Sequence, residues 1–278
     1  MSWRRSIPLL LLTGNALAIE GSIIGAGVEA DSADGVALSA IADVGLTEQT
    51  WLTAAIARNS VDSQRGQSLN TWYGDLSIDH WFEPVGIRGG VSYWGDSDTL
   101  ESIDWQGSIY WRSETAMVGA DFEFRDFSVQ LPGFNNFPGR EVDFDATGIG
   151  LSTRFDLGDR FSLGLRGMDY DYSVNLRLTD NRPILDLLSF SRLSLINSLV
   201  DYRASATLGV EAGKSRWQFD SGKWKGEVDG GETISATISF LTPLNERSDI
   251  EFGLGVDDSD LYGDVTFFSV YIYFYSGN

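Results

Sequence analysis

The residues of this 278-residue sequence that could do chemistry are mainly those with carboxylate and guanidinium side chains. The chain has 40 Asp and Glu residues, 20 Lys and Arg residues, one histidine (His80) and no cysteine. This composition excludes thiolate nucleophiles, disulfide frameworks and multi-histidine metal sites, so we expect no cofactor. The formal net charge of −20 also opposes nucleic-acid binding, which requires Lys and Arg to neutralise phosphates.

Many of the charged residues recur at every second position of segments whose other positions are apolar. Asp104 lies between Ile103 and Trp105, and Asp121, Glu123 and Arg125 alternate with apolar residues in the same way. A period of two is typical of a β-strand with one apolar and one polar face. The charges are therefore expected to be positioned by strands, all on one face of a sheet.

Fourteen such segments follow one another along the chain. We expect strands over residues 19–30, 35–45, 50–59, 70–81, 85–95, 101–113, 115–126, 141–155, 160–174, 199–212, 214–226, 232–242, 249–257 and 265–275. Twelve to sixteen strands fit the pattern, because the alternation is poor across 217–228. It also changes phase near Thr147 and Gly167, which we interpret as β-bulges.

The length of the segments separates two all-β architectures. In a soluble sandwich the apolar faces share a core, whereas in a membrane barrel they contact lipid. Most segments match the ~9–11 residues that a tilted strand needs to cross a bilayer better than the ~5–6 of an average soluble strand. The sequence therefore predicts a transmembrane antiparallel up-and-down β-barrel of about 14 strands.

The connections between segments also alternate in length. Every second one is tight, whereas long ones occur at 60–69, 127–140 and 174–198. Short turns at one end and longer loops at the other are typical of bacterial outer-membrane barrels. The tight connections, expected at the periplasmic end, lie near Thr47, 83–84, 113–114, 157–159, 213–214 and 243–247.

The N-terminal segment has the features of a secretory signal peptide. Arg4 and Arg5 precede the apolar run 7–12, and Ala16-Leu17-Ala18 provides small residues at cleavage spacing. We expect residues 1–18 to be a signal peptide and residues 19–278 to form a single barrel domain.

With this segment, the repeated alternation and an aromatic last strand (Val265 to Tyr275), the chain resembles bacterial outer-membrane β-barrel proteins of the porin-like channel class. The resemblance is architectural, covers the whole mature chain and assigns no subfamily. It implies outer-membrane localisation, lipid and lipopolysaccharide as neighbours, and insertion by the barrel-assembly machinery. Interfacial aromatic girdles are expected to include Trp51, Trp72, Trp81, Trp94, Trp105, Trp111, Trp217 and Trp224.

In such a barrel the polar faces line the lumen. We expect lumen-lining positions at Arg88, Asp104, Arg112, Asp121, Glu123, Arg125, Arg154, Arg166, Asp201 and Arg203, with further acids at Asp43, Asp75, Asp79, Asp143, Asp145, Glu211, Asp249 and Glu251. An excess of carboxylates would select cations, with a basic ladder opposite an acidic wall. The alternative is that Arg and Asp neutralise each other and stabilise a closed interior.

These features predict a passive diffusion channel for ions or small polar solutes. A closed or plugged barrel that acts in surface interaction or envelope assembly is the alternative. The long connection 174–198 would decide between them by lying inside or outside the lumen. The acidic stretch 257–264 is expected to be a solvated outer loop, with weak divalent-cation binding as the alternative.

Enzymatic sites of membrane barrels are not predicted. His80 is followed by Trp81 and Phe82, not by the Ser two residues further on that outer-membrane lipid hydrolases use. It also lies beside the tight Glu83-Pro84 turn, where a girdle histidine is a sufficient interpretation. The pairs Asp143/Asp145 and 169/171 could do acid–base work, but alternating acids are ordinary on a lumen wall.

Overall fold

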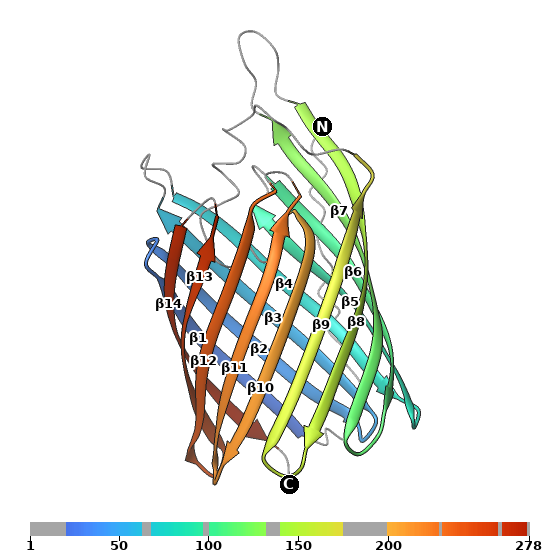
Figure 1. Cartoon of the computed structure of the whole chain (residues 1–278), viewed down its shortest axis with the longest axis vertical. Coiled ribbons are helices and arrows are strands. Elements are labelled where there is room, and N and C mark those ends of the chain that lie inside the picture. The colour runs from blue at the N-terminus through green and yellow to red at the C-terminus, as the bar shows by residue number, and fades with distance from the viewer. Residues whose placement is uncertain are drawn as a thin grey trace, which may run out of the picture.

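A computed structural model describes residues 21–62, 68–96, 100–131, 140–174, 199–227, 230–260 and 263–276. In these ranges, fourteen strands form a closed barrel (Figure 1). They are β1 (Gly21–Asp31), β2 (Gly35–Thr47), β3 (Thr50–Asp62), β4 (Ser68–Trp81), β5 (Val85–Asp96), β6 (Leu100–Arg112), β7 (Ala116–Leu131), β8 (Arg140–Leu157), β9 (Phe161–Tyr172), β10 (Val200–Ala212), β11 (Ser215–Gly226), β12 (Glu232–Asn245), β13 (Ser248–Ser259) and β14 (Gly263–Ser276). In the described ranges, no helix is long and apolar enough to cross a membrane.

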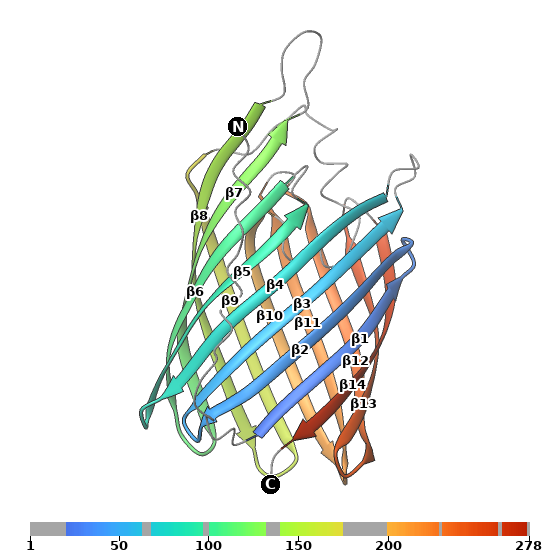
Figure 2. The same ribbon diagram turned by 180° about the vertical axis from the view of Figure 1, so that it is seen from behind.

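Each strand pairs antiparallel with its neighbours in sequence, and β1 closes the barrel on β14 from Ser22↔Ser276 to Asp31↔Phe267. The strands are tilted across the barrel wall, as the front and back views in Figures 1 and 2 show. The predicted up-and-down barrel of about 14 strands is confirmed. The predicted signal peptide and residues 175–198 of the long connection lie outside the described part of the chain.

The six predicted tight connections all lie at the end of the barrel where β14 ends (Figure 1). Two of them contain glycines in the left-handed region, Gly158 (φ 70°) and Gly213 (φ 69°), which allow an abrupt reversal. We call this the periplasmic end, after the usual position of short turns in barrels of this kind. At the opposite end β7 and β8, which have 16 and 18 residues, project beyond the other strands (Figures 1 and 2).

The outer surface of the barrel is apolar. Ile149, Leu151 and Leu254 are each more than half exposed, a condition that suits contact with lipid rather than water. Trp105 and Trp111 also point outward, as expected of girdle residues. Trp94 and Trp224 do not: they are 3% and 8% exposed and lie in buried clusters inside the barrel. The register also places Trp51 and Trp81 in the inward row, so the girdle prediction is wrong for these four.

The predicted bulges near Thr147 and Gly167 are absent. Strand β8 pairs with β7 and with β9 without a shift of register at either position. Because the alternation is continuous from Arg154, Asp143 and Asp145 face outward, not into the lumen. The observed register shifts are elsewhere, beside Thr47, Val200 and Asn245.

The apparent change of phase has a different cause. At the loop end, the inward-facing residues are apolar and form two clusters. One cluster centres on Trp94, Leu100, Phe127 and Phe144, and the other on Met168, Tyr170, Val200 and Trp224. The apolar side chains therefore move from the outer face to the inner face as these strands approach the loop end.

Candidate functional site

The inner surface of the barrel divides into two sides of different charge. Inward-facing arginines occur only on β5 to β11 among the described side chains, and we call this side the arginine wall. The inward faces of β12, β13, β14, β1, β2, β3 and β4 hold no Lys or Arg in the described strands, and we call this side the acidic wall. The arginines are Arg88, Arg112, Arg125, Arg154, Arg166, Arg203 and Arg216.

Arg125 is the most enclosed charge of the arginine wall. The register of β6 and β7 sets it opposite Asp104, and its Nε lies 3.3 Å from Asp104 Oδ1 and 3.6 Å from Glu123 Oε1. Its guanidinium carbon is 4.8 Å from the ring centroid of Phe127, and the residue is 1% exposed. Arg125 is thus held by carboxylates and an aromatic ring and is not accessible to a solute.

Glu123 joins this group to the strands on the other side of β8. Its Oε2 accepts hydrogen bonds from Arg203 Nη2 at 2.5 Å and from the Tyr170 hydroxyl at 2.9 Å. The Tyr170 ring reaches across β8 because Gly148 lies beneath it; a Cβ at Gly148 would be 2.6 Å from the ring. The Arg203 guanidinium in turn lies 5.4 Å from the centroid of this ring.

Two further ion pairs lie closer to the periplasmic end. Asp121 accepts a hydrogen bond from Ser108 at 2.6 Å and lies 3.5 Å from Arg166 Nε. Asp79, on β4 at the border of the two walls, lies 2.7 Å from Arg88 Nη2. The Arg166 and Arg88 side chains are 48% and 58% exposed, so these guanidinium groups remain in contact with the lumen.

The last predicted arginines lie near the periplasmic end. The Arg112 guanidinium stacks over the Trp81 ring at 5.5 Å, and Arg154 Nε lies 3.4 Å from Asp156 Oδ1. The cross-strand partner of both arginines is Met117 of β7, which places them at one level of the wall. The Arg154 side chain is 52% exposed.

Asp201 does not join the lumen groups. It lies at the register shift between Val200 and Tyr202, and its carboxylate pairs with Lys225 Nζ at 2.6 Å. Lys225 is the cross-strand partner of Tyr202, whose row faces outward with Ala204. The extra residue at the shift takes Asp201 out of the inward row, which could not be read from the alternation alone.

The acidic wall contains carboxylates that are hydrogen-bonded to neutral donors. Asp43 accepts from Thr53 at 2.6 Å, Glu251 from Tyr273 at 3.0 Å and Asp249 from Tyr275 at 2.8 Å. The inward tyrosines were missed, although their period of two along the last strand and the glycines of β1 opposite them were available as signals. Further inward acids that were missed include Glu29, Asp31 and Asp257.

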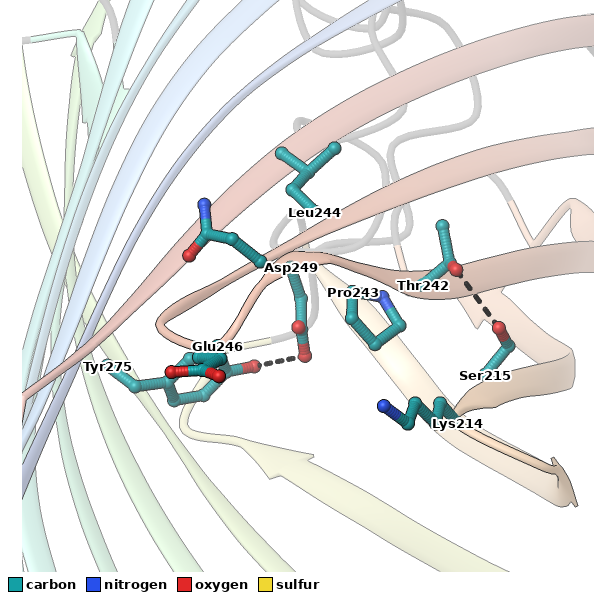
Figure 3. Close-up of a pocket in the computed structure, with 9 residues that line it drawn as sticks. Lys214, Ser215, Thr242, Pro243, Leu244, Glu246, Asp249 and Tyr275 are labelled. Atoms are coloured by element: carbon teal, nitrogen blue, oxygen red, sulfur yellow. Dashed lines mark hydrogen bonds between the residues drawn. The ribbon is translucent and has the colours of Figure 1, made fainter.

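A cavity of about 700 Å³ opens at the periplasmic end of this wall. Figure 3 shows Asp249 and Tyr275 facing each other on one side of it, with Lys214 and Glu246 at its edge. The lining residues come from the β10–β11 turn, the β12–β13 hairpin and the end of β14.

No group of three metal-binding side chains is present among the described residues. The alternation of β13 explains this for the acidic stretch 257–264, because Asp257 faces inward whereas Asp258 pairs with the outward-facing Asp264. The carboxylates therefore diverge and do not form a common oxygen cage.

Comparison with known proteins gives the class of the fold. No family model matches the sequence, and no curated protein matches it. The barrel is similar to CymD, a monoaromatic hydrocarbon channel, with a TM-score of 0.55 and 8% identity over 94% of this chain and 89% of that chain. It is also similar to a loop L8 deletion mutant of OmpT, an outer membrane protein of Vibrio cholerae, with a TM-score of 0.50 and 8% identity over 92% of this chain and all (100%) of that chain.

The chain therefore shares the β-barrel fold of this hydrocarbon channel and of this outer membrane protein, the architecture that the sequence resemblance implied. Its apolar outer surface and polar inner surface agree with a β-barrel that spans a membrane.

Proposed function

We propose that the protein is a porin-like passive diffusion channel for ions and small polar solutes. The observation that carries this proposal is the exposure of charged side chains inside a closed barrel, above all Arg88, Arg154 and Arg166. Eight strands enclose only side chains, whereas 16–18 strands enclose an aqueous channel. A 14-strand barrel with hydrated charges on its inner wall is suited to a narrow aqueous path.

The distribution of charge defines the selectivity of the proposed channel. Ion pairs offset much of the charge of the arginine wall, whereas the carboxylates of the acidic wall accept hydrogen bonds from neutral hydroxyl groups, which add no positive charge. A lumen with net negative charge attracts cations and repels anions. We therefore propose cation selectivity, with the arginine wall giving polar solutes a preferred orientation.

We further propose that the protein is not an enzyme. Asp143 and Asp145 face outward. The other pair of acids, Asp169 and Asp171, also faces outward, because their cross-strand partners on β8 lie in the outward row. His80 Nδ1 is 2.7 Å from the Thr50 hydroxyl, and His80 pairs with the outward-facing Ile87. These residues thus lie outside the lumen and apart from its charges.

The proposed partners besides solutes are lipopolysaccharide and the barrel-assembly machinery. Phe268 and Phe274 of β14 point towards lipid and are about half exposed, which supports the interpretation of the last strand as an aromatic assembly signal. The neighbouring tyrosines of the same strand face inward and need a separate explanation.

The test is the zero-current potential of the refolded protein in a planar bilayer under a KCl gradient. Steady conductance with a potential of the sign set by K⁺ is the expected result. A protein that is folded by its heat-modifiable gel mobility but does not conduct would refute the open channel and favour the plugged alternative.

A further inference from the structure

A row of tyrosines lies along the inside of β14 in the periplasmic half of the barrel. Tyr271, Tyr273 and Tyr275 occupy successive inward positions, and the rings of Tyr271 and Tyr273 stack with centroids 6.3 Å apart and an interplanar angle of 16°. All three are half-buried. Each tyrosine therefore has part of its surface open to the lumen. Because the rings point inward, contact with lipid or membership of an interfacial girdle does not explain them.

The rings pack against two glycines of β1, Gly25 and Gly27, which we call the glycine floor. Gly27 is the cross-strand partner of Tyr271, and Gly25 is that of Tyr273. A Cβ at Gly25 would be 2.7 Å from Tyr273 Cδ1 and 2.9 Å from Ile41 Cγ2, and a Cβ at Gly27 would overlap the Tyr271 ring. The glycines thus let the rings lie flat against the wall, which fixes their faces in position.

Carboxylates flank the rings on the other side. Tyr273 donates to Glu251 and Tyr275 donates to Asp249, so each acid lies at the edge of a ring and its partner is a neutral hydroxyl. The described strands of this wall have no inward Lys or Arg to neutralise these acids. Lys214 lines the same cavity as Asp249, but no ion pair of Asp249 or Glu251 is found in the described strands. An aromatic face beside a carboxylate is the chemistry that recognises organic ammonium ions.

The row is continuous with the cavity at the periplasmic end. Asp249 and Tyr275 belong to both, and their hydrogen bond forms one side of the cavity (Figure 3). A solute that leaves the cavity would meet Tyr275, then Tyr273 and Tyr271, along a path of about 13 Å for four residues of strand.

We propose that Tyr271, Tyr273 and Tyr275, with Glu251 and Asp249, form a track that binds small organic cations such as quaternary ammonium ions during passage through the lumen. This inference rests on the proposed channel function and names a solute class for it. The rings attract organic cations by cation–π interaction, whereas hydrated K⁺ makes only weak contacts of this kind. The acids attract both kinds of cation by their negative charge. The track therefore distinguishes organic from inorganic cations, whereas the total lumen charge distinguishes cations from anions.

The experiment measures interruption of the single-channel K⁺ current by choline. Choline is expected to interrupt the current at lower concentrations than its uncharged isostere 3,3-dimethylbutan-1-ol. The double variant Tyr271→Leu/Tyr273→Leu should raise the choline concentration required about tenfold, since two cation–π contacts are lost. Tyr271→Phe/Tyr273→Phe retains the rings and should retain most of the effect.

Phe268→Leu is the matched control, because Phe268 lies on the same strand but faces lipid. It should leave the choline effect unchanged. The K⁺/Cl⁻ zero-current potential should be the same in wild type and in the leucine variant, since neither substitution changes a charge. Loss of this selectivity together with the choline effect would indicate a collapsed wall and overturn the proposal.

The remaining outcomes separate the two proposals. A conducting protein in which choline acts no better than its isostere, or in which glucose acts equally well, overturns the cation track and leaves the channel intact. If the folded protein does not conduct, calorimetric titration of choline into the detergent-solubilised barrel tests whether the tyrosine track binds choline. Binding that the leucine variant loses supports the track, and the absence of binding overturns it.

Discussion

The two walls of the lumen hold their carboxylates in different ways. On the arginine wall, Asp104, Asp121 and Glu123 lie against guanidinium groups. On the acidic wall, Asp43 and Glu251 accept hydrogen bonds from hydroxyl groups. An ion pair cancels charge and ties two strands together, whereas a hydroxyl donor orients a carboxylate and leaves its charge in place. The arginine wall is therefore suited to rigidity, and the acidic wall supplies the potential that solutes experience.

The largest effect expected from this contrast is on stability at Arg125. Arg125→Met removes the guanidinium and leaves the buried Asp104 without an ion-pair partner among the described residues, whereas Glu123 retains only Arg203. Breaking a buried ion pair from one side costs about 3–5 kcal/mol. We expect the free energy of unfolding, measured by urea titration in lipid vesicles, to fall by this amount.

Arg88→Met is the matched control on the same wall. The Arg88 side chain is 58% exposed and pairs with Asp79, and exposed pairs contribute about 1 kcal/mol or less. If the two variants unfold at the same urea concentration, the buried group is not what stabilises the arginine wall.

The glycine floor of the acidic wall is the next site to test. Gly27→Ala places a methyl group in the Tyr271 ring, and overpacking of this kind costs about 1–3 kcal/mol. Gly107→Ala adds the same methyl group at an outward position with no heavy atom within 4 Å, so a change below about 0.5 kcal/mol is expected. Equal urea midpoints for the two variants would show that the tyrosine rings do not depend on the glycines.

Selectivity should respond in opposite directions to the two walls. Asp43→Asn with Asp75→Asn lowers the negative charge of the acidic wall, and Arg88→Gln with Arg166→Gln lowers the positive charge of the other. The first pair should reduce the K⁺/Cl⁻ permeability ratio and the second should raise it, each by about twofold, because wall charge selects ions by sign. Zero-current potentials under a KCl gradient give both ratios, and shifts in the same direction would contradict a lumen divided by charge.

The barrel itself could be predicted because lipid and water impose a repeating pattern on every strand. Fourteen segments of alternating polarity gave the number of strands and the end at which the tight turns lie. The inward direction of Asp104, Asp121, Glu123 and Arg125 also follows from that alternation, since the apolar residues between them must face lipid.

The predictions failed where a strand leaves the lipid. In the membrane the apolar row is the outer one, but at the loop end Phe144 and Tyr170 are apolar and face inward, where they pack in buried clusters. A pattern of period two shows that a strand has two faces, but it does not show which face contacts lipid. The change of the apolar row from the outer to the inner face was therefore interpreted as a bulge, and Asp143 was assigned to the lumen. At Asp201 the error is the reverse, because a real register shift left no mark in the alternation.

The smallest expected effect tests this corrected assignment. Asp143→Asn with Asp145→Asn removes two acids, as Asp43→Asn with Asp75→Asn does, but on the outer face of the projecting β7–β8 hairpin. Charges exposed to bulk solvent are screened within about 8 Å at physiological salt, whereas charges inside a lumen act on every ion that passes. The zero-current potential should therefore be the same as in wild type. A shift as large as that of the lumen pair would place the two carboxylates on the ion path and would restore the bulge near Thr147.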